Sequence, residues 1–294
     1  MSRLFRVELR RLLARRLLRF TTLVVVALLT IAGAIVFFTS DMTPAEVERV
    51  QNERLQSCVE SQGFGNAPPG TTDFEAFCRE DLGSEIDPRL DYVEVADAVT
   101  ELGFPFMMLG WILGASSIGA EWNNRTLTTT LTWESRRVRV LVAKMLALVL
   151  VVAVWILLLL VFYALAMYPA AAAHGITSTV DSTVLGDMFE SMLRVDALAV
   201  VFALLGFALA TMGRNTAAAL GVGFAYLAVV ETIIRGFKPE WSDWLLGDNI
   251  SLFLFGVGES PLTHGQTTAA VILVAYIGAL LLAATALFRR REMA

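Results

Sequence analysis

The sequence has 294 residues, of which 56% are hydrophobic and 17% are charged, and its formal net charge is −5 at pH 7. Its mean hydropathy of +0.64 is too high for an ordinary soluble domain and indicates a protein with several membrane-spanning segments. Two cysteines are too few for a disulfide-dense scaffold or a four-cysteine zinc site. We therefore expect an all-α polytopic membrane protein.

The first segment, residues 1–19, contains seven arginines. On a helix, Phe5, Leu9 and Leu12 share one face, so we expect a basic amphipathic helix that lies on the membrane surface. This helix either anchors the next span through its positive charge or docks against a partner, and the two roles are compatible.

Residues 20–39 carry no charge and, at about 1.5 Å per residue, can cross a hydrocarbon layer of about 30 Å. We predict that they form the first transmembrane helix. The alternative is a signal peptide cleaved among the small residues near Gly33. We favour a retained helix because the apolar run continues to Phe38, beyond such a cleavage point.

Residues 40–97 have the opposite character, with 14 acidic residues, and we expect a small external helical domain. Two capping boxes mark helix starts, at Thr43 to Glu46 and at Thr72 to Glu75. Gly63 and Gly83 mark the corresponding helix ends.

Cys58 and Cys78 fall on the predicted inward faces of these two helices. A disulfide between them would staple a hairpin that is too short to have much core of its own. Such a bond forms on the oxidising side of a membrane. The alternative is two unrelated buried thiols.

The second span is predicted at 98–118, where Gly103 and Pro105 favour a bend. Gly110 and Gly114 have GxxxG spacing, which lets another helix approach closely. We interpret this spacing as packing and not as a dimer signature.

A polar loop at 119–139 separates the second span from the third, which we place at 140–167 and end at Pro169. The wider stretch 116–147 holds five basic residues against Glu121 and Glu134. The remaining predicted segments are an external loop at 168–193, span four at 194–212, a cytoplasmic turn at 213–215, span five at 216–234, external re-entrant helices at 235–266, span six at 267–288 and a cytoplasmic tail at 289–294.

The re-entrant prediction rests on residues 235–266, which are neither a full span nor a polar loop. The apolar run from Ile250 to Val257 is too short to cross a bilayer. Trp241 and Trp244 are residues that prefer the interfacial zone.

The distribution of charge predicts the orientation of these six spans. If both termini are cytoplasmic, 16 of the 23 basic residues lie inside and 24 of the 28 acidic residues lie outside or near the outer ends. This positive-inside bias predicts cytoplasmic termini, a cytoplasmic 119–139 loop and an external cysteine-bearing domain.

Sequence motifs of catalysis are absent. The sequence contains no GxxxxGK[ST] phosphate-binding loop, no HExxH and no GxSxG, and its two histidines lie in separate outer loops. We therefore expect no enzyme activity, no cofactor or metal bound by this chain, and no nucleic-acid partner. Within the spans, Glu231 and Arg235 are one helical turn apart, and we predict a structural ion pair, with a substrate or proton site as the alternative.

The 116–147 stretch carries a resemblance to a known family. The order Gly119-Ala120-Glu121, then Thr126-Leu127, Ser135-Arg136 and Lys144 resembles the pattern of ABC-2 type transporter permeases. The resemblance extends to the amphipathic N-terminal helix, the six spans, the short turn between spans four and five and the re-entrant segment. The external domain at 40–97 departs from it, because many relatives have a short connection there.

The resemblance implies a membrane subunit that pairs with a second permease, a copy or a paralogue, and with separate ATP-binding subunits that hold ATP and Mg. The 119–139 loop would carry a coupling helix that sits on the ATPase, whereas composition alone allows a plain positive-inside loop. We expect Glu121 to form an orienting salt bridge with Arg125, with Lys144 or with the N-terminal helix. The residues assigned to coupling are Glu121, Trp122, Arg125, Thr128, Trp133, Arg136, Arg137 and Lys144.

The expected function is thus the permease subunit of an ATP-driven ABC exporter in a bacterial plasma membrane, moving an amphipathic, drug-like or lipid-like compound outward. The alternative is an ATPase-coupled membrane protein that transmits force to an envelope partner through its external domain, without transport.

Overall fold

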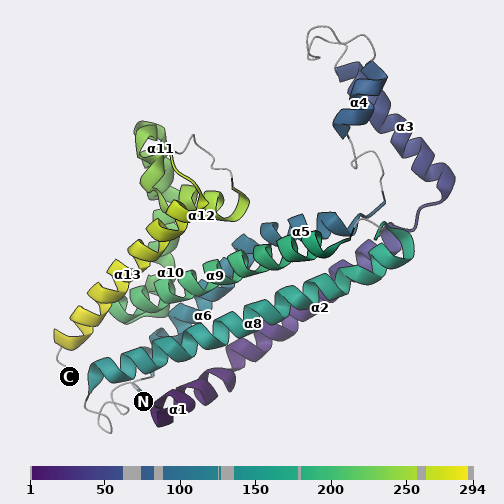
Figure 1. Cartoon of the computed structure of the whole chain (residues 1–294). Coiled ribbons are helices and arrows are strands. Elements are labelled where there is room, and N and C mark those ends of the chain that lie inside the picture. The colour runs from purple at the N-terminus through teal and green to yellow at the C-terminus, as the bar shows by residue number, and fades with distance from the viewer. Residues whose placement is uncertain are drawn as a thin grey trace. The chain divides into compact units, whose positions relative to one another are not determined.

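In the computed structural model of the chain, the described residues fold almost entirely into helices (Figure 1). Within this part of the chain, an isolated bridge between Asp91 and Ile176 is the only β contact. The described residues are 2–61, 74–82, 89–124, 126, 136–177, 180–256 and 263–290.

Six helices of the described residues are long and apolar enough to cross a membrane, which confirms the expected multi-pass, all-α architecture. They are α2 (Arg16–Thr39), α6 (Gly103–Asn123), α8 (Arg137–His174), α9 (Ser182–Gly213), the run Thr216–Phe237 and α13 (Gln266–Arg290). The fifth consists of α10 (Thr216–Ala225), the π-helix η3 (Tyr226–Val230) and α11 (Glu231–Phe237).

Helix α8 is longer than predicted. We expected Pro169 to end the third span, but this proline lies inside the helix, which continues to His174. A proline within a helix removes one N–H donor. The four alanines that follow are the strongest helix formers and favour continuation of the helix.

Helix α9 is also longer than predicted, because residues 182–193 were expected to form a loop and are helical. Arg194 forms an ion pair with Glu190 one turn earlier on the same face of the helix. The polar side chains that indicated a loop are therefore compatible with a helix that continues beyond the apolar run.

The chain forms two compact units, which we describe separately. The first comprises Met1–Ala27, Ala96–Phe162 and Thr183–Ala294, and the second comprises Leu28–Val95 and Tyr163–Ser182.

In the first unit, the backbones of α6 and α9 are in direct contact. Gly110 and Gly114 face the main chain of Ala199 and Ala203, and a Cβ on either glycine would collide with it. The GxxxG spacing therefore serves helix packing within the chain, as predicted.

The same helix α6 also packs against α10. The indole ring of Trp111 fills the space beside Gly223, so that a side chain there would overlap the ring. Trp111 is 2% exposed and stacks edge-on against Phe202 of α9, with 6.1 Å between ring centroids. Helix α6 is thus wedged between α9 and α10.

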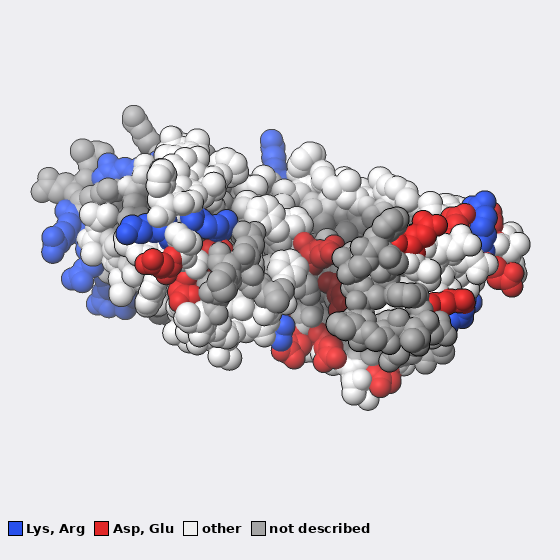
Figure 2. All heavy atoms as spheres, turned by 90° about the horizontal axis from the view of Figure 1, so that it is seen from above, with Lys and Arg blue, Asp and Glu red and all other residues white. Residues whose placement is uncertain are grey.

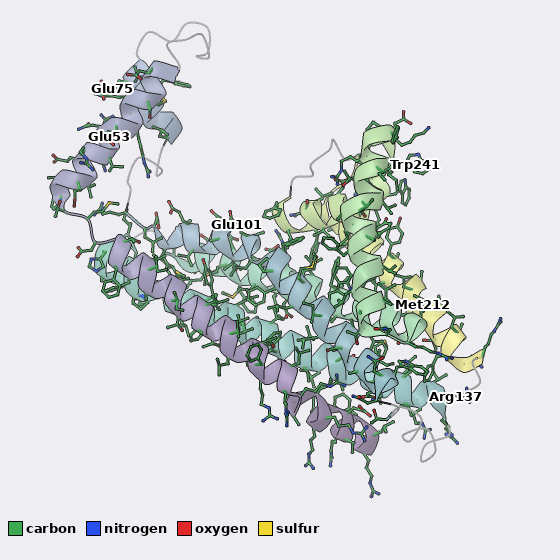
Figure 3. All side chains as sticks on the ribbon, turned by 180° about the vertical axis from the view of Figure 1, so that it is seen from behind. Glu53, Glu75, Glu101, Arg137, Met212 and Trp241 are labelled. Atoms are coloured by element: carbon green, nitrogen blue, oxygen red, sulfur yellow. A yellow bond between two sulfur atoms is a disulfide. The ribbon has the colours of Figure 1, made fainter. Side chains whose placement is uncertain are left out.

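Between α11 and α13 the chain forms a short 3-10 helix, η4 (Pro239–Trp244), and helix α12 (Leu246–Phe255). Figure 3 labels Met212 at the end of α9 and Trp241 beyond the far end of the next span. The Asp243 carboxylate accepts hydrogen bonds from the hydroxyl and the N–H of Thr263, which lower the pKa of Asp243. Helix α12 is too short to cross a membrane, as predicted.

The second unit contains the cysteine-bearing segment, with α3 (Pro44–Ser61) and α4 (Phe74–Leu82) joined by the Cys58–Cys78 disulfide. The predicted first capping box is present, because Glu46 accepts a hydrogen bond from the Thr43 N–H, 2.9 Å away, and donates its own N–H to the Thr43 hydroxyl. Thr72, which would cap the second helix in the predicted second box, and both glycine stops lie outside the described residues.

The same unit includes α5 (Tyr92–Glu101) up to Val95 and the end of α8. The buried Tyr92 hydroxyl donates to the carbonyl oxygen of Ala164, 3.1 Å away. Two main-chain hydrogen bonds of Ile176, with Leu90 and Tyr92, form the bridge between Asp91 and Ile176.

We expect the disulfide to supply a large part of the stability of the α3–α4 hairpin. The two cysteines are 20 residues apart, and closing a loop of that size stabilises a folded unit by about 3 kcal/mol. In the full-length Cys58→Ala variant, hydrogen exchange in residues 44–61 should become much faster, while α9 keeps its protection. The exposed neighbouring Ser57 provides the matched control as Ser57→Ala. Unchanged exchange in the cysteine variant would show that the hairpin does not depend on the bond.

Candidate functional site

Basic side chains gather at one end of the first unit, to which α1 (Ser2–Leu13), the start of α8 and the end of α13 contribute (Figure 2). Four charged residues of this end are half-buried or buried and contact one another. We call them the charged cluster, which consists of Glu8, Arg15, Glu121 and Lys144.

Lys144 is the centre of the charged cluster. Its Nζ lies 2.7 Å from Glu8 Oε2 and 2.8 Å from Glu121 Oε2, and the residue is only 4% exposed. Because Glu8 is on α1, Glu121 on α6 and Lys144 on α8, this one ammonium group connects three helices.

Arg15 lies in the break between α1 and α2 and reaches the same carboxylate. Its guanidinium lies 3.3 Å from Glu121 Oε1 and donates to the carbonyl oxygens of Ser116 and Ser117, at 2.8 and 2.6 Å. Burial lowers the pKa of Arg15, while Glu121 and Glu8 act in the opposite direction. An arginine stays protonated under such conditions, so the contact remains ionic.

Within the charged cluster two carboxylates face two cations, and the exposed Arg11 adds a third cation 3.4 Å from Glu8 Oε1. Such pairing is what allows charged groups to be buried at all. The space between the side chains is a cavity of about 10 Å³, at the lower limit for one water molecule. The charged cluster therefore has no room for a substrate and acts as a joint between helices.

A second contact starts at the next residue, Trp122. The guanidinium carbon of Arg214 lies 5.0 Å from the centroid of the Trp122 ring, which is cation–π geometry. Phe288, which is 1% exposed, packs edge-on against the same indole with 6.2 Å between centroids. Trp122 thereby contacts the turn between α9 and α10 and the last turn of α13.

Apart from Trp122, the predicted coupling residues fall into three groups. Glu121 and Lys144 form the expected ion pair, and the N-terminal region contributes to it through Glu8 and Arg15. Arg136 is exposed and precedes Arg137, which Figure 3 labels at the start of α8. The predicted residues Arg125, Thr128 and Trp133 lie outside the described residues.

The predicted Glu231–Arg235 pair is replaced by other partners. Arg235 Nη2 lies 2.8 Å from Asp248 Oδ1. The Glu231 carboxylate accepts the N–H groups of Leu246 and Gly247, at 2.7 and 2.9 Å. Two N–H donors at the start of a helix attract a carboxylate more specifically than a guanidinium four residues away on the same helix.

Four residues of these contacts were not predicted individually: Glu8, Arg15, Arg214 and Phe288. Glu8 carries a signal in the sequence, because it is the one acidic residue among the first 20 and is surrounded by arginines. Arg214 has a φ of 56°, which is uncommon for a residue other than glycine and is not visible in the sequence.

Candidate metal ligands do not cluster in the part of the chain that the structure describes. No group of three or more His, Cys, Asp or Glu residues there could hold a metal ion. The charged cluster and the Trp122 contact together join α1, α6, α8, α9, α10 and α13 around the two ends of the polar loop. This arrangement can pass a displacement of the loop to several spans.

Comparison with known proteins places the chain in a family. Residues 73–294 match the family model described as "Protein of unknown function (DUF2705)". The chain is also 26% identical over 200 residues to "Uncharacterized protein YhcI" of Bacillus subtilis (strain 168), and the match covers 62% of this chain and 63% of the relative. Because the family model covers three quarters of the sequence, the chain belongs to the DUF2705 family of proteins of unknown function.

Proposed function

We propose that this protein is the membrane-spanning permease subunit of an ATP-driven ABC exporter, which moves an amphipathic compound outward across a bacterial plasma membrane. ATP is hydrolysed by a separate partner chain, and the polar loop between α6 and α8 receives the movement of that chain. A second permease copy or paralogue completes the assembly. The ordered motif from Gly119 to Lys144 supports this family.

The charged cluster is the observation that carries the proposal. Glu121 is the third-last residue of α6 and Lys144 lies in the second turn of α8, so their ion pair ties together the two ends of the loop. Glu8 and Arg15 add the N-terminal helix to the same joint. A force on the loop would therefore move α1, α6 and α8 together.

The contacts of Trp122 connect the same loop to further helices of the first unit. Through Arg214 and Phe288 it reaches the α9–α10 turn and α13. Close packing of α6 against α9 leaves no room for the two helices to slide independently. Alternating access in a two-state transporter needs such rigid coupling between the driven element and the spans.

The proposed orientation places both termini and the loop in the cytoplasm. It rests on the excess of Arg and Lys at that end, 16 of 23 in the chain, and on the disulfide of the opposite compartment. The basic residues at the ends of the polar loop are also attracted to the anionic inner leaflet.

The disulfide-linked α3–α4 hairpin supports a second candidate function, in which the chain transmits force to an envelope protein and carries no substrate. A stapled, acidic, external hairpin presents a rigid surface to a protein ligand. The two functions share the loop and differ in what stimulates ATP hydrolysis.

The test of coupling uses inverted membrane vesicles from cells that express the chain with its partner ATPase. ATP-dependent accumulation of a fluorescent amphiphile should fall in Arg136→Ala and Glu121→Ala by roughly 2- to 30-fold, the range expected for loss of about 0.5–2 kcal/mol of coupling. The chain should still insert in the membrane at wild-type levels.

Arg290→Ala, an exposed arginine at the end of α13, serves as the control for loss of positive charge alone. Wild-type accumulation in both loop variants would contradict the assignment. ATP hydrolysis that rises only when a protein ligand of residues 40–97 is added, with no accumulation of amphiphile, would favour the second function.

A further inference from the structure

A lateral cavity of about 430 Å³ lies in the first unit, away from the charged cluster. Its walls come from α9, α10, η3 and α13, together with Leu246 at the start of α12. The volume falls within the range of about 300–1,000 Å³ that is typical of ligand sites. The side chains that define it best are Leu205, Leu209, Val222, Tyr226, Ile277 and Ala279.

The cavity offers its occupant no free polar group among the residues that line it. The Tyr276 hydroxyl is already used by the protein, because it donates to the carbonyl oxygen of Trp244, 3.0 Å away. The Tyr226 hydroxyl interacts electrostatically with the Glu231 carboxylate. The remaining lining residues are aliphatic or glycine, so the cavity selects an apolar occupant.

The cavity is continuous with the surface of the spans that faces hydrocarbon. Val222, which lines it, is 61% exposed, and Val274 and Leu282 of α13 are 61% and 73% exposed. In a chain with six membrane-spanning helices, these apolar side chains face lipid. An occupant therefore enters sideways from the bilayer.

We propose that this cavity holds one alkyl chain of a membrane amphiphile, either a bilayer lipid or a smaller single-chain compound. A helix of a second copy is the alternative occupant, and the cross-linking arm of the test separates it from an alkyl chain. An alkyl chain is thin, flexible and already present at high concentration in the hydrocarbon layer.

Occupancy follows from packing and not from the hydrophobic effect, since the chain leaves one apolar medium for another. When the cavity is empty, the side chains that line it lack dispersion contacts on one side, and an alkyl chain supplies them. The π-helical stretch Tyr226–Val230 forms part of the wall, and such irregular turns inside helices are frequent at functional sites.

The inference rests on the membrane location of the chain and does not require the proposed ATP-driven function. It is tested with the full-length protein in nanodiscs that contain phosphatidylcholine with a diazirine on one acyl chain. After irradiation, peptide mapping should find the label concentrated in residues 222–227 and 276–280.

A matched pair of variants on α13 separates the cavity from the general lipid surface. Ala279→Trp fills the cavity and should reduce the label in these peptides several-fold. Gly278→Trp adds the same bulk where a Cβ has open space and should leave the label unchanged. If Ala279→Trp does not fold, Val222→Trp fills the cavity from the opposite wall.

A second arm distinguishes the two sources of the alkyl chain. Displacement of the label by added palmitate identifies a site open to free single-chain amphiphiles, whereas label that palmitate does not displace identifies a bilayer lipid. Label spread evenly over all lipid-facing helices and unaffected by Ala279→Trp would overturn the proposal. So would disulfide cross-linking of two copies through Ala279→Cys, which would make the cavity a contact between copies.

Discussion

Replacing Lys144 by methionine should lower the free energy of unfolding by about 3–5 kcal/mol, the usual cost of removing one partner from a buried ion pair. The substitution keeps an unbranched apolar side chain and removes the ammonium group, with its charge and its N–H donors. It leaves the Glu8 and Glu121 carboxylates, which lie 2.7 and 2.8 Å from Nζ, without their shared cation. SDS-induced unfolding of the purified chain in mixed micelles measures the loss.

The control is the double variant Lys144→Met, Glu8→Gln, which removes the cation and one carboxylate together and leaves Glu121 paired with Arg15. Because no carboxylate of the cluster is then left buried without a partner, we expect it to recover at least half of the lost stability. A Lys144→Met variant within about 0.5 kcal/mol of the wild type, the range of ordinary surface substitutions, would show that the cluster is solvated and is not a joint.

The second large effect is expected at Glu231, whose carboxylate caps the start of α12. Glu231→Ala leaves the buried N–H of Leu246 and the half-buried N–H of Gly247 without their acceptor. Each unsatisfied donor costs about 1–3 kcal/mol, and the interaction with the helix dipole is lost as well. Hydrogen exchange of residues 246–256 in the full-length protein should therefore accelerate by orders of magnitude.

Two further variants sharpen this test. Glu231→Gln keeps one acceptor oxygen without the charge and should give an intermediate exchange rate. Gly247→Ala disrupts the same contact sterically, because the added Cβ would lie 2.6 Å from Glu231 Oε2. Glu240→Ala, an exposed carboxylate in η4, provides the control. Equal exchange rates in Glu231→Ala and Glu240→Ala would contradict the capping role.

Features with a local signal were predictable from the sequence. Apolar length and absence of charge predicted the six spans, and the spacing of Thr43 and Glu46 predicted a capping box that the structure contains. The Cys58–Cys78 bond followed from two inward-facing positions on a helical hairpin. Each of these three features depends on a few neighbouring residues, so it can be predicted without knowledge of the tertiary structure.

Features that depend on distant partners were predicted less well. The sequence places Arg235 one turn after Glu231, but the fold brings Asp248 and the start of α12 within reach, and these partners replace the local pair. Helices α8 and α9 extend beyond the apolar runs, where four alanines follow Pro169 in α8 and an ion pair joins Glu190 to Arg194 in α9.

In the candidate site, three partners were expected for Glu121, namely Arg125, Lys144 or the N-terminal helix, and the structure pairs it with Lys144 and with Arg15. The burial of Glu8, which is 3% exposed, was not predicted. The helical wheel of α1 indicated that the apolar face of this helix would be buried. Arg214 reaches Trp122 only through the conformation of the turn between α9 and α10.

The central claim is that a separate ATPase binds the polar loop between α6 and α8. The most direct measurement is affinity purification of the tagged full-length chain from its own membranes in mild detergent, followed by mass spectrometry. We predict that a protein with a GxxxxGK[ST] motif is recovered with the wild type and is depleted when Arg136 and Arg137 are both changed to glutamate. Recovery of no such protein, or equal recovery with the wild type and the variant, would contradict the account.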